Sequence, residues 1–542
     1  MTIRDLTVGP APRPGVVVGA RGSLTVEGLA VEATRVSGMV LLGDLEARAL
    51  LVRDTGPRAV DLEFGRGLLV QGGAQVVLEG AVIEGNTDVG VSVADAGTGL
   101  AISDAVIRDT APRPSSGLGG AGLVVDLEAA VTASRLLLEH NLYAALISYG
   151  AASVDVTHGV FRDTQSSSTG GTRGNGAAVE EGATVRLAAT LLERNRDTGL
   201  LVRAGAEAIL TDLVVRETEP QRSDDRYGWG LSVESASRAT LERGLLEGNR
   251  DLGIFAAHEG TTLAARDLVV RDTRPRPDGR VGRGLTSVEG ASTTFANALF
   301  EGNREISLLF ADSGTVAELT DVVVRDTLPD ETTGAAGRAL SVQDSAALRL
   351  ARSLVERNPG LNLMAALSAD LSAEDLVIRG VDGPVAGERG RGLVVQQGAT
   401  ARVLRGLLEG TRDAAVLVVG EGTSAEMEEV RILETCAQDC ASCVRPAGGT
   451  ALVSVHSAAV TLRDFEIRGA DLCGVLLAQD GEIDLFSGRV AGCAIGGSLQ
   501  VPGYDLDRLS AGVAYQDNGT NLDATSLPVP EATAPSVVPE MP

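Results

Sequence analysis

The feature that most constrains this chain is the alternation of two short phrases along nearly its whole length. One phrase carries Arg, as in "DLVVRDT" (267–273), and the other carries Glu, as in "GLLEGN" (244–249). Each series recurs about every 54 residues, which indicates a repeat protein rather than three or four ordinary domains. The two series are Arg53, Arg108, Arg162, Arg216, Arg271, Arg325 and Arg379, and Glu84, Glu139, Glu193, Glu247, Glu301, Glu356 and Glu409.

Short apolar runs between Gly, Asn, Asp or Thr predict strands rather than helices. Examples are "GLLV" (199–202), "DLVV" (212–215) and "TLLE" (190–193), and no helical periodicity extends over ten residues. A coil of about 24 residues with three short strands has the size of one turn of a parallel β-helix. One coil cannot bury its apolar side alone, so the coils must stack. The prediction is an all-β, single-stranded parallel β-helix over residues 1–500, with about 18 coils in two-coil repeats.

Stacking explains the alternation of charge. Equivalent residues of adjacent coils lie about 4.8 Å apart, so each Arg is expected between two Glu, whereas a column of one sign would repel itself. The preceding apolar residue, such as Val270 or Leu246, is expected to point inward. A slip by one coil would set Arg against Arg, so the column also favours a single register.

A second predicted column lies two residues further on, where Thr and Asn alternate. Asn tolerates left-handed turn geometry and its side chain can bond the turn backbone, so a hydrogen-bonded ladder along one corner is expected. A calcium site at "NTDVG" (86–90) or "NRDTG" (195–199) is the weaker reading, because turn chemistry already explains these residues. The column is Thr55, Asn86, Thr110, Asn141, Thr164, Asn195, Thr218, Asn249, Thr273, Asn303, Thr327 and Asn358.

The strings "LLERNRDTGLLV" (191–202) and "LLEGNRDLGIF" (245–255) resemble right-handed parallel β-helix repeat proteins of the pectin-lyase-like superfamily, including bacterial surface β-helix proteins. The resemblance covers roughly residues 1–500 and implies the fold more strongly than any activity. Right-handedness follows from the resemblance and from the usual hand of parallel crossovers. A leucine-rich repeat, which "LTDLVVRET" (210–218) loosely fits, is disfavoured by Pro- and Gly-rich connections and by the absence of helical segments.

One connection in each repeat is longer and more variable than the rest, and these connections are expected to project from one edge. Variable loops on a rigid scaffold are where a cell-surface glycan or protein would bind; plain solvated turns are the alternative. Tyr227 and Trp229, in "DDRYGWG" (224–230), form a candidate sugar-stacking patch. The loops are residues 56–64, 111–119, 165–173, 219–227, 274–282 and 328–336.

The ends of the chain depart from the repeat. "TIRDL" (2–6) already resembles an Arg phrase, and no signal peptide is visible. Residues 501–526 are expected to form a C-terminal cap or irregular segment, and the Pro-rich residues 527–542 an extended, disordered tail. No apolar run approaches the ~18–20 residues of a membrane helix.

All five cysteines lie late in the chain. "CAQDCASC" (436–443) has the Cys-x3-Cys-x2-Cys spacing of radical SAM enzymes but lacks a barrel context, so an iron–sulfur site is disfavoured. Disulfides are expected instead, since three of the cysteines fall near the same corner on successive coils. Such bridges would imply an oxidising, extracellular compartment, and the odd number leaves one thiol over. The disulfide candidates are Cys436, Cys440, Cys443, Cys473 and Cys493.

Charge and residue pattern argue against several functions. The net charge of −26 disfavours nucleic acid and anionic membranes as partners. The resemblance implies that enzymes of this fold need clustered Asp, or Ca²⁺ with an Arg base, whereas the recurrent carboxylates here are flanked by Arg. The four His occupy different places in the repeat: His140, His158, His258 and His456. We therefore expect a non-catalytic extracellular or cell-surface scaffold, structural, adhesive or spacing, with no cofactor or metal; the alternative is a polysaccharide-active enzyme or carbohydrate-binding protein.

Overall fold

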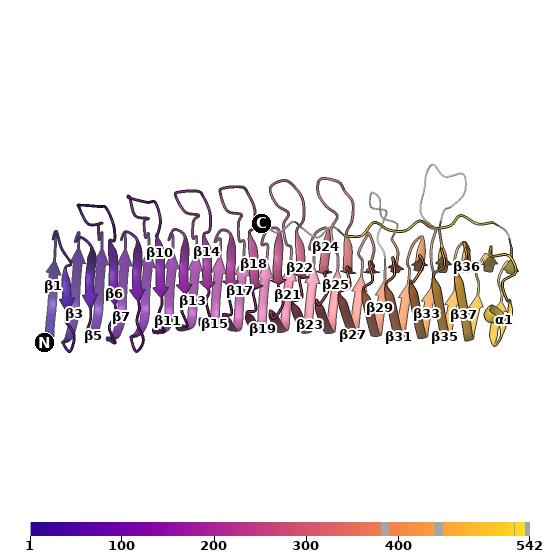
Figure 1. The fold of residues 1–542 in the computed structure, drawn as a ribbon, viewed down its shortest axis with the longest axis horizontal. Helices are drawn as coiled ribbons and strands as arrows, with labels where there is room; N and C mark the ends of the chain where they lie inside the picture. Colours follow the sequence, from indigo (N-terminus) through magenta and orange to yellow (C-terminus); the bar gives the residue numbers. More distant parts are fainter. Residues whose placement is uncertain (1, 381–389, 438–447, 525, 537–542) are drawn as a thin grey trace. The chain divides into compact units, whose positions relative to one another are not determined.

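The computed structural model describes residues 2–380, 390–437, 448–524 and 526–536. The chain divides into two compact units, Met1–Leu268 and Val269–Pro542, and the division falls within β21 (Thr262–Arg271). Each unit is a right-handed parallel β-helix in which long strands of one sheet, sheet A, alternate along the chain with short strands of a second, sheet B (Figure 1). The predicted fold is confirmed, and the described residues contain 20 strands of the sheet A type, against about 18 predicted coils.

In unit 1 every strand pairs in parallel with the equivalent strand of the next coil. The sheet A strands are β1 (Thr2–Val8), β3 (Ser23–Glu32), β5 (Asp44–Arg53), β7 (Gln75–Glu84), β9 (Gly99–Arg108), β11 (Ala130–Glu139), β13 (Ser153–Arg162), β15 (Thr184–Glu193), β17 (Glu207–Arg216) and β19 (Arg238–Glu247). The sheet B strands are β2 (Val16–Val18), β4 (Ser37–Leu41), β6 (Arg66–Val70), β8 (Val89–Val93), β10 (Ala121–Val125), β12 (Ala144–Ser148), β14 (Asn175–Val179), β16 (Thr198–Val202), β18 (Trp229–Glu234) and β20 (Leu252–Ala257).

Unit 2 repeats this arrangement and adds the short helix α1 (Asp507–Ser510). Its sheet A strands are β23 (Ser292–Glu301), β25 (Val316–Arg325), β27 (Ala347–Glu356), β29 (Asp370–Arg379), β31 (Thr400–Glu409), β33 (Ser424–Leu433), β35 (Ala459–Arg468), β37 (Glu482–Ala491) and β39 (Val513–Gln516). Its sheet B strands are β22 (Arg283–Val288), β24 (Ile306–Phe310), β26 (Arg338–Val342), β28 (Leu363–Ala365), β30 (Leu393–Gln396), β32 (Ala414–Val419), β34 (Thr450–Val455), β36 (Cys473–Leu477), β38 (Ile495–Leu499) and β40 (Thr520–Asp523).

Strands β39 and β40 pair with β37 and β38 after α1, so both sheets continue past residue 500. The division of the chain into a solenoid, a cap from residue 501 and a tail from residue 527 stays a prediction.

Each ten-residue strand bends at its sixth residue, which takes a left-handed conformation. Asp104 has φ 53° and Arg135 has φ 51°. The alternation of buried and exposed residues shifts by one position there, as in β9, so the strand consists of two straight segments. With the sheet B strand these segments give three short strands per coil, as predicted. Neighbouring bends also pair by charge: Arg135 Nη2 donates to Asp104 Oδ2 at 2.6 Å, and this contact lowers the pKa of Asp104.

The core lies between the sheets and is built from identical positions of successive coils. In sheet B, Leu200 pairs with Ala177 and Leu231, and all three are fully buried. The residue before this row is often Gly because the backbones approach closely there. A Cβ on Gly176 would lie 2.5 Å from the carbonyl oxygen of Gly199, so a side chain at this point would force the coils apart.

The predicted charge column is confirmed within each unit. Its contacts are asymmetric: Arg108 Nη2 lies 2.7 Å from Glu84 Oε2, whereas its Nη1 lies 3.6 Å from Glu139 Oε1. The Glu193 side chain is only 6% exposed, whereas its partner Arg216 is 43% exposed, so this pair is buried on its carboxylate side. In register are Arg53, Glu84, Arg108, Glu139, Arg162, Glu193 and Arg216 in unit 1, and Glu301, Arg325, Glu356, Arg379 and Glu409 in unit 2.

The Thr and Asn column is also confirmed, with the Asn side chains inside the corner. Asn195 Oδ1 accepts a hydrogen bond from the backbone N–H of Thr164 at 3.2 Å, and its Nδ2 donates to the carbonyl of Phe161 at 2.9 Å. Asn195 is fully buried. Each such Asn therefore ties its corner to the preceding coil with both amide atoms satisfied, as buried polar groups require.

We predict that Glu193→Arg destabilises the protein more than Glu193→Gln does. The charge reversal places Arg beside Arg216 at a nearly buried position and should lower the free energy of unfolding by about 3 kcal/mol. The Gln variant keeps the side-chain volume and should cost about 1 kcal/mol. Urea denaturation of both variants measures the difference, and equal effects would contradict a role for the charge.

Candidate binding groove

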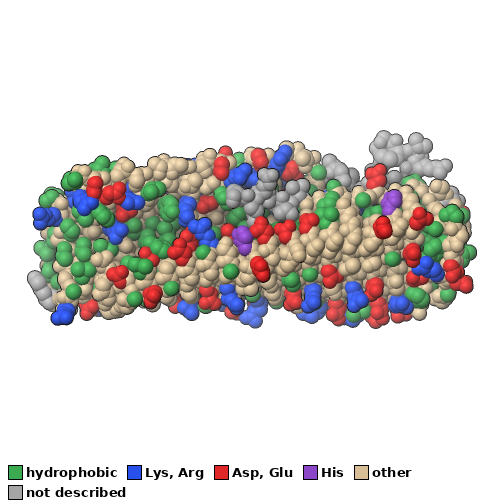
Figure 2. Space-filling model, viewed as in Figure 1, with side chains coloured by type: hydrophobic (Ala, Val, Ile, Leu, Met, Phe, Trp, Pro, Cys, Tyr) green, Lys and Arg blue, Asp and Glu red, His purple; other side chains and the backbone are tan. Residues whose placement is uncertain are grey.

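The outer face of sheet B forms the floor of a candidate groove. In unit 1 the fourth residue of each five-residue strand lies in the outward row: Leu69 pairs with Val40 on one side and Ser92 on the other, beside the buried row of Leu68. Val40 and Leu69 are half-buried, as are the equivalent residues Val124 and Ile147. Figure 2 shows hydrophobic side chains gathered in a hollow over unit 1. Four members of this row, Val40, Leu69, Val124 and Ile147, form an apolar surface that the described residues leave partly open, whereas Ser92 between them is buried.

Within each unit the variable loops precede the sheet B strands and form a wall beside the floor, at one edge of that unit (Figure 1). Successive loops bond one another across two coils. Arg113 Nη1 lies 2.6 Å from Glu63 Oε2, and Thr169 Oγ1 donates to the carbonyl of Gly117 at 3.0 Å. In unit 2, Thr332 Oγ1 donates to the carbonyl of Asp278 at 3.0 Å. The loops therefore form a ridge rather than independent solvated turns.

A column of carboxylates, which the sequence reasoning missed, secures the junction of wall and floor. Each lies in the turn after an Asn or Thr of the corner and bonds a residue at or just before the start of the preceding sheet B strand. Asn175 Nδ2 donates to Asp197 Oδ2 at 3.3 Å, and Arg391 Nε donates to Asp413 Oδ2 at 2.7 Å. The recurring "NTD", "NRD", "NRE" and "TRD" triplets were the available signal. The members are Asp88, Asp197, Asp251, Glu305 and Asp413.

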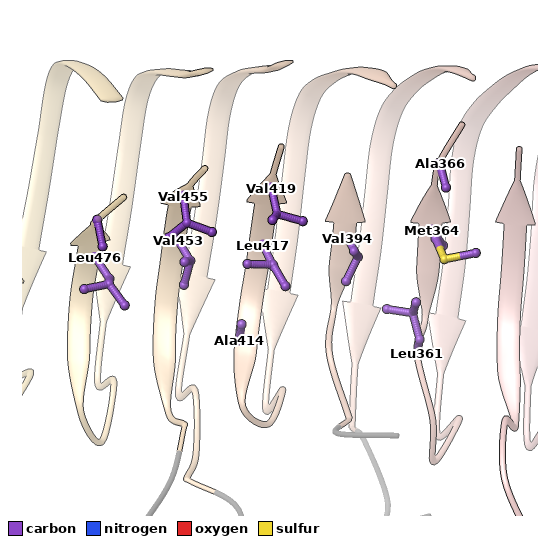
Figure 3. Packing of buried hydrophobic residues seen from close by; sticks show 11 residues of the cluster. Leu361, Met364, Ala366, Val394, Ala414, Leu417, Val419, Val453, Val455 and Leu476 are labelled. Carbon is purple, nitrogen blue, oxygen red and sulfur yellow. The ribbon is translucent and has the colours of Figure 1, made fainter. Parts of the chain in front are cut away.

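In unit 2 the same outward row is completely covered. Met364, Val394, Leu417, Val453 and Leu476 pair in register across consecutive strands and are 0% exposed (Figure 3). They belong to an apolar cluster against which Leu527 and Val529 of the C-terminal segment pack. The cover over this face is therefore, at least in part, residues 527–536 of the same chain, which we call the strap.

Two Gln side chains hold the strap by its backbone. Gln396 Oε1 accepts from the N–H of Thr533 at 3.0 Å and its Nε2 donates to the carbonyl of Thr533 at 2.5 Å. Gln343 makes the same pair of bonds with Ser536, at 3.0 and 2.8 Å. Arg391 Nη1 adds bonds to the carbonyl of Glu531 and to Thr533 Oγ1, at 2.7 and 2.8 Å.

The strap carries no helix or strand and runs back along unit 2, as the yellow segment after β40 shows in Figure 1. Sequence reasoning expected this Pro-rich stretch to be extended and disordered, and did not foresee its partners. Arg338, Gln343, Arg391 and Gln396 lie 137 to 198 residues away from the strap residues they bond, so no local pattern connects the two.

The candidate glycan contacts lie where the wall meets the floor. Trp229 is 7% exposed, its ring centroid is 4.6 Å from that of Phe255, and its Nε1 donates to Asp251 Oδ2 at 2.8 Å. Tyr227 meets the Trp229 ring edge-on with centroids 4.9 Å apart, and burial raises the pKa of Tyr227. The glycan role of this pair stays a prediction, but the Trp229 face is occupied by protein.

The disulfide candidates are only partly described, because Cys440 and Cys443 lie outside the described residues. Cys473 and Cys493 are buried free thiols, and each donates to a backbone carbonyl two residues away. Burial raises the pKa of Cys473 to about 12 and raises that of Cys493. Cys436 is exposed. The structure therefore gives no support to a bridge at Cys473 or Cys493.

Neither a metal centre nor a membrane helix emerges from the described ranges. No three or more His, Cys, Asp or Glu side chains within them are grouped so as to hold a metal ion. No helix among the same residues combines the length and hydropathy of a membrane span.

The parallel pairing of every coil within each unit decides the fold. The chain is a parallel β-helix repeat protein. No protein-family model matches its sequence, and no curated protein matches it. A similar solved chain occurs in the cryo-EM structure of the Vag8–C1 inhibitor complex; it is 13% identical, with a TM-score of 0.32, and the match covers 96% of this chain and 98% of that chain.

We predict that Asp197→Asn stabilises unit 1 in a pH-dependent way. Burial raises the pKa of Asp197 to about 6, above its ordinary value, so the folded state gains stability on protonation and loses it as the pH rises through about 6. The neutral Asn should therefore add about 1–2 kcal/mol at pH 8 and little at pH 4. Melting temperatures at both pH values test this; a pH-independent difference would count against it.

We predict that Cys473 and Cys493 resist alkylation in the folded protein and react fully after denaturation without reductant. Both thiols are buried with raised pKa values, and the reactive form is the thiolate. Iodoacetamide labelling followed by peptide mass mapping reads each cysteine separately, with exposed Cys436 as the internal comparison. Failure of either buried cysteine to label after denaturation would indicate a disulfide instead.

Proposed function

We propose that this protein is a non-catalytic, exported β-helix scaffold whose sheet B face in unit 1 binds an extended polypeptide segment of a partner at a cell surface. One observation carries the proposal. The outward row of sheet B is fully buried in unit 2, where the strap packs on it, while Val40, Leu69, Val124 and Ile147 at the equivalent positions of unit 1 are only half-buried. Other members of the unit 1 row are buried: Ser92, Ala178, Leu201, Ser232 and Phe255. Apolar rows bounded by polar walls mark interaction sites.

The polar rim of unit 1 supports a polypeptide with N–H groups or basic side chains as the ligand. Beside the partly open row, Asp126 occupies the strand-end position that Gln343 and Gln396 hold in unit 2. Glu180 and Glu234 hold this position on later coils, where the row is buried, and Glu180 pairs with Arg203 at 3.0 Å. A carboxylate accepts hydrogen bonds but donates none at neutral pH. Together with the net charge of −26, these positions disfavour a polyanionic polysaccharide.

The regularity of the charged columns supports a scaffold rather than an enzyme. Glycoside hydrolysis needs two carboxylates facing one another across the scissile bond. The carboxylates of both columns instead bond Arg, Asn or Trp side chains at repeated positions, as Glu84 bonds Arg108 and Asp251 bonds Trp229. The proposed location at a cell surface rests on the resemblance to surface β-helix proteins.

An array of proline-rich decapeptides, with and without Arg, tests the proposal on the full-length protein. Fluorescence anisotropy should detect binding that Ile147→Asp weakens at least ~10-fold, because the change puts a charge on the groove floor. Val77→Asp is the matched control, since Val77 is 49% exposed on sheet A, and it should leave binding unchanged. Equal loss in both variants, or no binding to any peptide, contradicts the proposal, as does release of reducing sugar from pectate.

A further inference from the structure

We propose that the sheet B face of unit 2 is a recognition site for polyproline II segments, reading three ligand residues for every two coils, with the strap as its resident ligand. The inference deepens the proposed function, on which it rests for the use of this face by a partner. The sheet B face selects the polyproline II conformation and a period of three residues. The chemical class of ligand is a proline-rich segment with two Ser or Thr residues three positions apart, as Thr533 and Ser536 are in the strap.

The hydrogen bonds between three Gln side chains and the strap set the ratio of three strap residues to two coils. Gln343 lies at the end of β26 and bonds Ser536, and Gln396 lies two coils later, at the end of β30, and bonds Thr533. The third contact comes four coils beyond Gln396, after β38, where Gln500 Nε2 donates to the carbonyl of Leu527 at 3.3 Å. Two coils thus match three strap residues, and four coils match six.

The spacing explains why this ratio recurs. Two coils rise about 9.6 Å at the separation of neighbouring strands. One turn of polyproline II has three residues and rises about 9.3 Å, so every third residue returns to the same side at nearly the same interval. A β-strand would present every second residue instead. Pro528, Pro530 and Pro535 fix their own φ near the polyproline value and restrict the residue before each to extended conformations.

The side chains at the contact points discriminate between ligand residues. Gln343 and Gln396 each need a backbone N–H and a carbonyl from one residue, which Pro cannot supply. The three-residue period puts Pro530, which is buried, at the coil of β34, and there the equivalent position is the apolar Val455. The face thus places Gln343 and Gln396 where the strap has Ser536 and Thr533, Gln500 where it has Leu527, and the aliphatic Val455 where it has Pro530.

Two Arg side chains add preference for a hydroxyl at the amide-bonded positions. Arg391 Nη1 donates to Thr533 Oγ1 at 2.8 Å, and Arg338 Nη1 donates to Ser536 Oγ at 3.1 Å. Side-chain amides and guanidinium groups, rather than a sheet edge, supply these bonds. The mode therefore differs from β-strand addition and belongs with recognition of preformed polyproline II segments.

Residue-resolved hydrogen exchange on the full-length protein tests the period directly. The amides of Thr533 and Ser536 donate to Gln396 and Gln343, and should exchange at least ~10-fold more slowly than those of Ala532 and Ala534. Protection of Ala532 and Ala534 together with Ser536 would mean a two-residue period and would overturn the proposal. Uniformly fast exchange through the strap would overturn it as well.

A matched pair of proline substitutions tests the three-residue period by removing one backbone N–H at a time. Thr533→Pro removes the N–H that Gln396 binds and should make the strap at least ~10-fold more sensitive to a broad-specificity protease. Ala532→Pro, one residue away, keeps both amide contacts and should leave cleavage unchanged. Equal cleavage of the two variants overturns the three-residue period.

The outcome is separable from that of the proposed function. Ile147→Asp lies in unit 1 and should leave strap exchange and cleavage as in the wild type. If the peptide array shows no binding to unit 1 while Thr533 and Ser536 are protected, the proposed function fails and the polyproline II site stands.

Discussion

The backbone hydrogen bonds between coils, made in strict parallel register, are the constraint on which the rest of the structure depends. Because each coil repeats the last at the strand spacing of about 4.8 Å, any side chain placed once is placed in a column. Apolar columns become the core, and charged columns must alternate in sign or repel. Arg108 lies closer to the preceding Glu84, at 2.7 Å, than to the following Glu139, at 3.6 Å, and Arg162, Arg216 and Arg325 also pair with the Glu of the preceding coil at 2.7 Å.

Polar groups inside the stack are tolerated because the register supplies their partners. Asn195 is fully buried, yet both of its amide atoms bond the backbone of the coil before it. The register also supplies partners to the carboxylate column: Asp197 bonds Asn175 at the start of β14, and Asp413 bonds Arg391 just before β30. Burial raises the pKa of Asp197, and neither the hydrogen bond from the neutral Asn175 nor the charge of Arg173 offsets it.

The periodic part of the structure could be predicted from the sequence, and the contacts outside the period could not. The Arg and Glu column and the Thr and Asn corner follow from intervals visible in the chain, because equal spacing in sequence becomes vertical stacking. The strap contacts join Gln343 to Ser536 and Gln396 to Thr533 across 193 and 137 residues, with no periodic link between partners. The residues of the carboxylate column could be found from the recurring triplets such as "NRD". Their hydrogen-bond partners could not, because these depend on the geometry of the corner where the loop wall begins.

The alternating column sets the step by which a chain of this kind can lengthen. Duplication of one coil would bring two Arg or two Glu into register, whereas duplication of a whole pair keeps every ion pair and the Thr and Asn order. Growth or shrinkage that preserves the ladder therefore comes in units of about 54 residues and about 9.6 Å of axis. Each added two-coil repeat would also carry one more variable loop. The length of the solenoid and the number of variable loops in its wall therefore increase together.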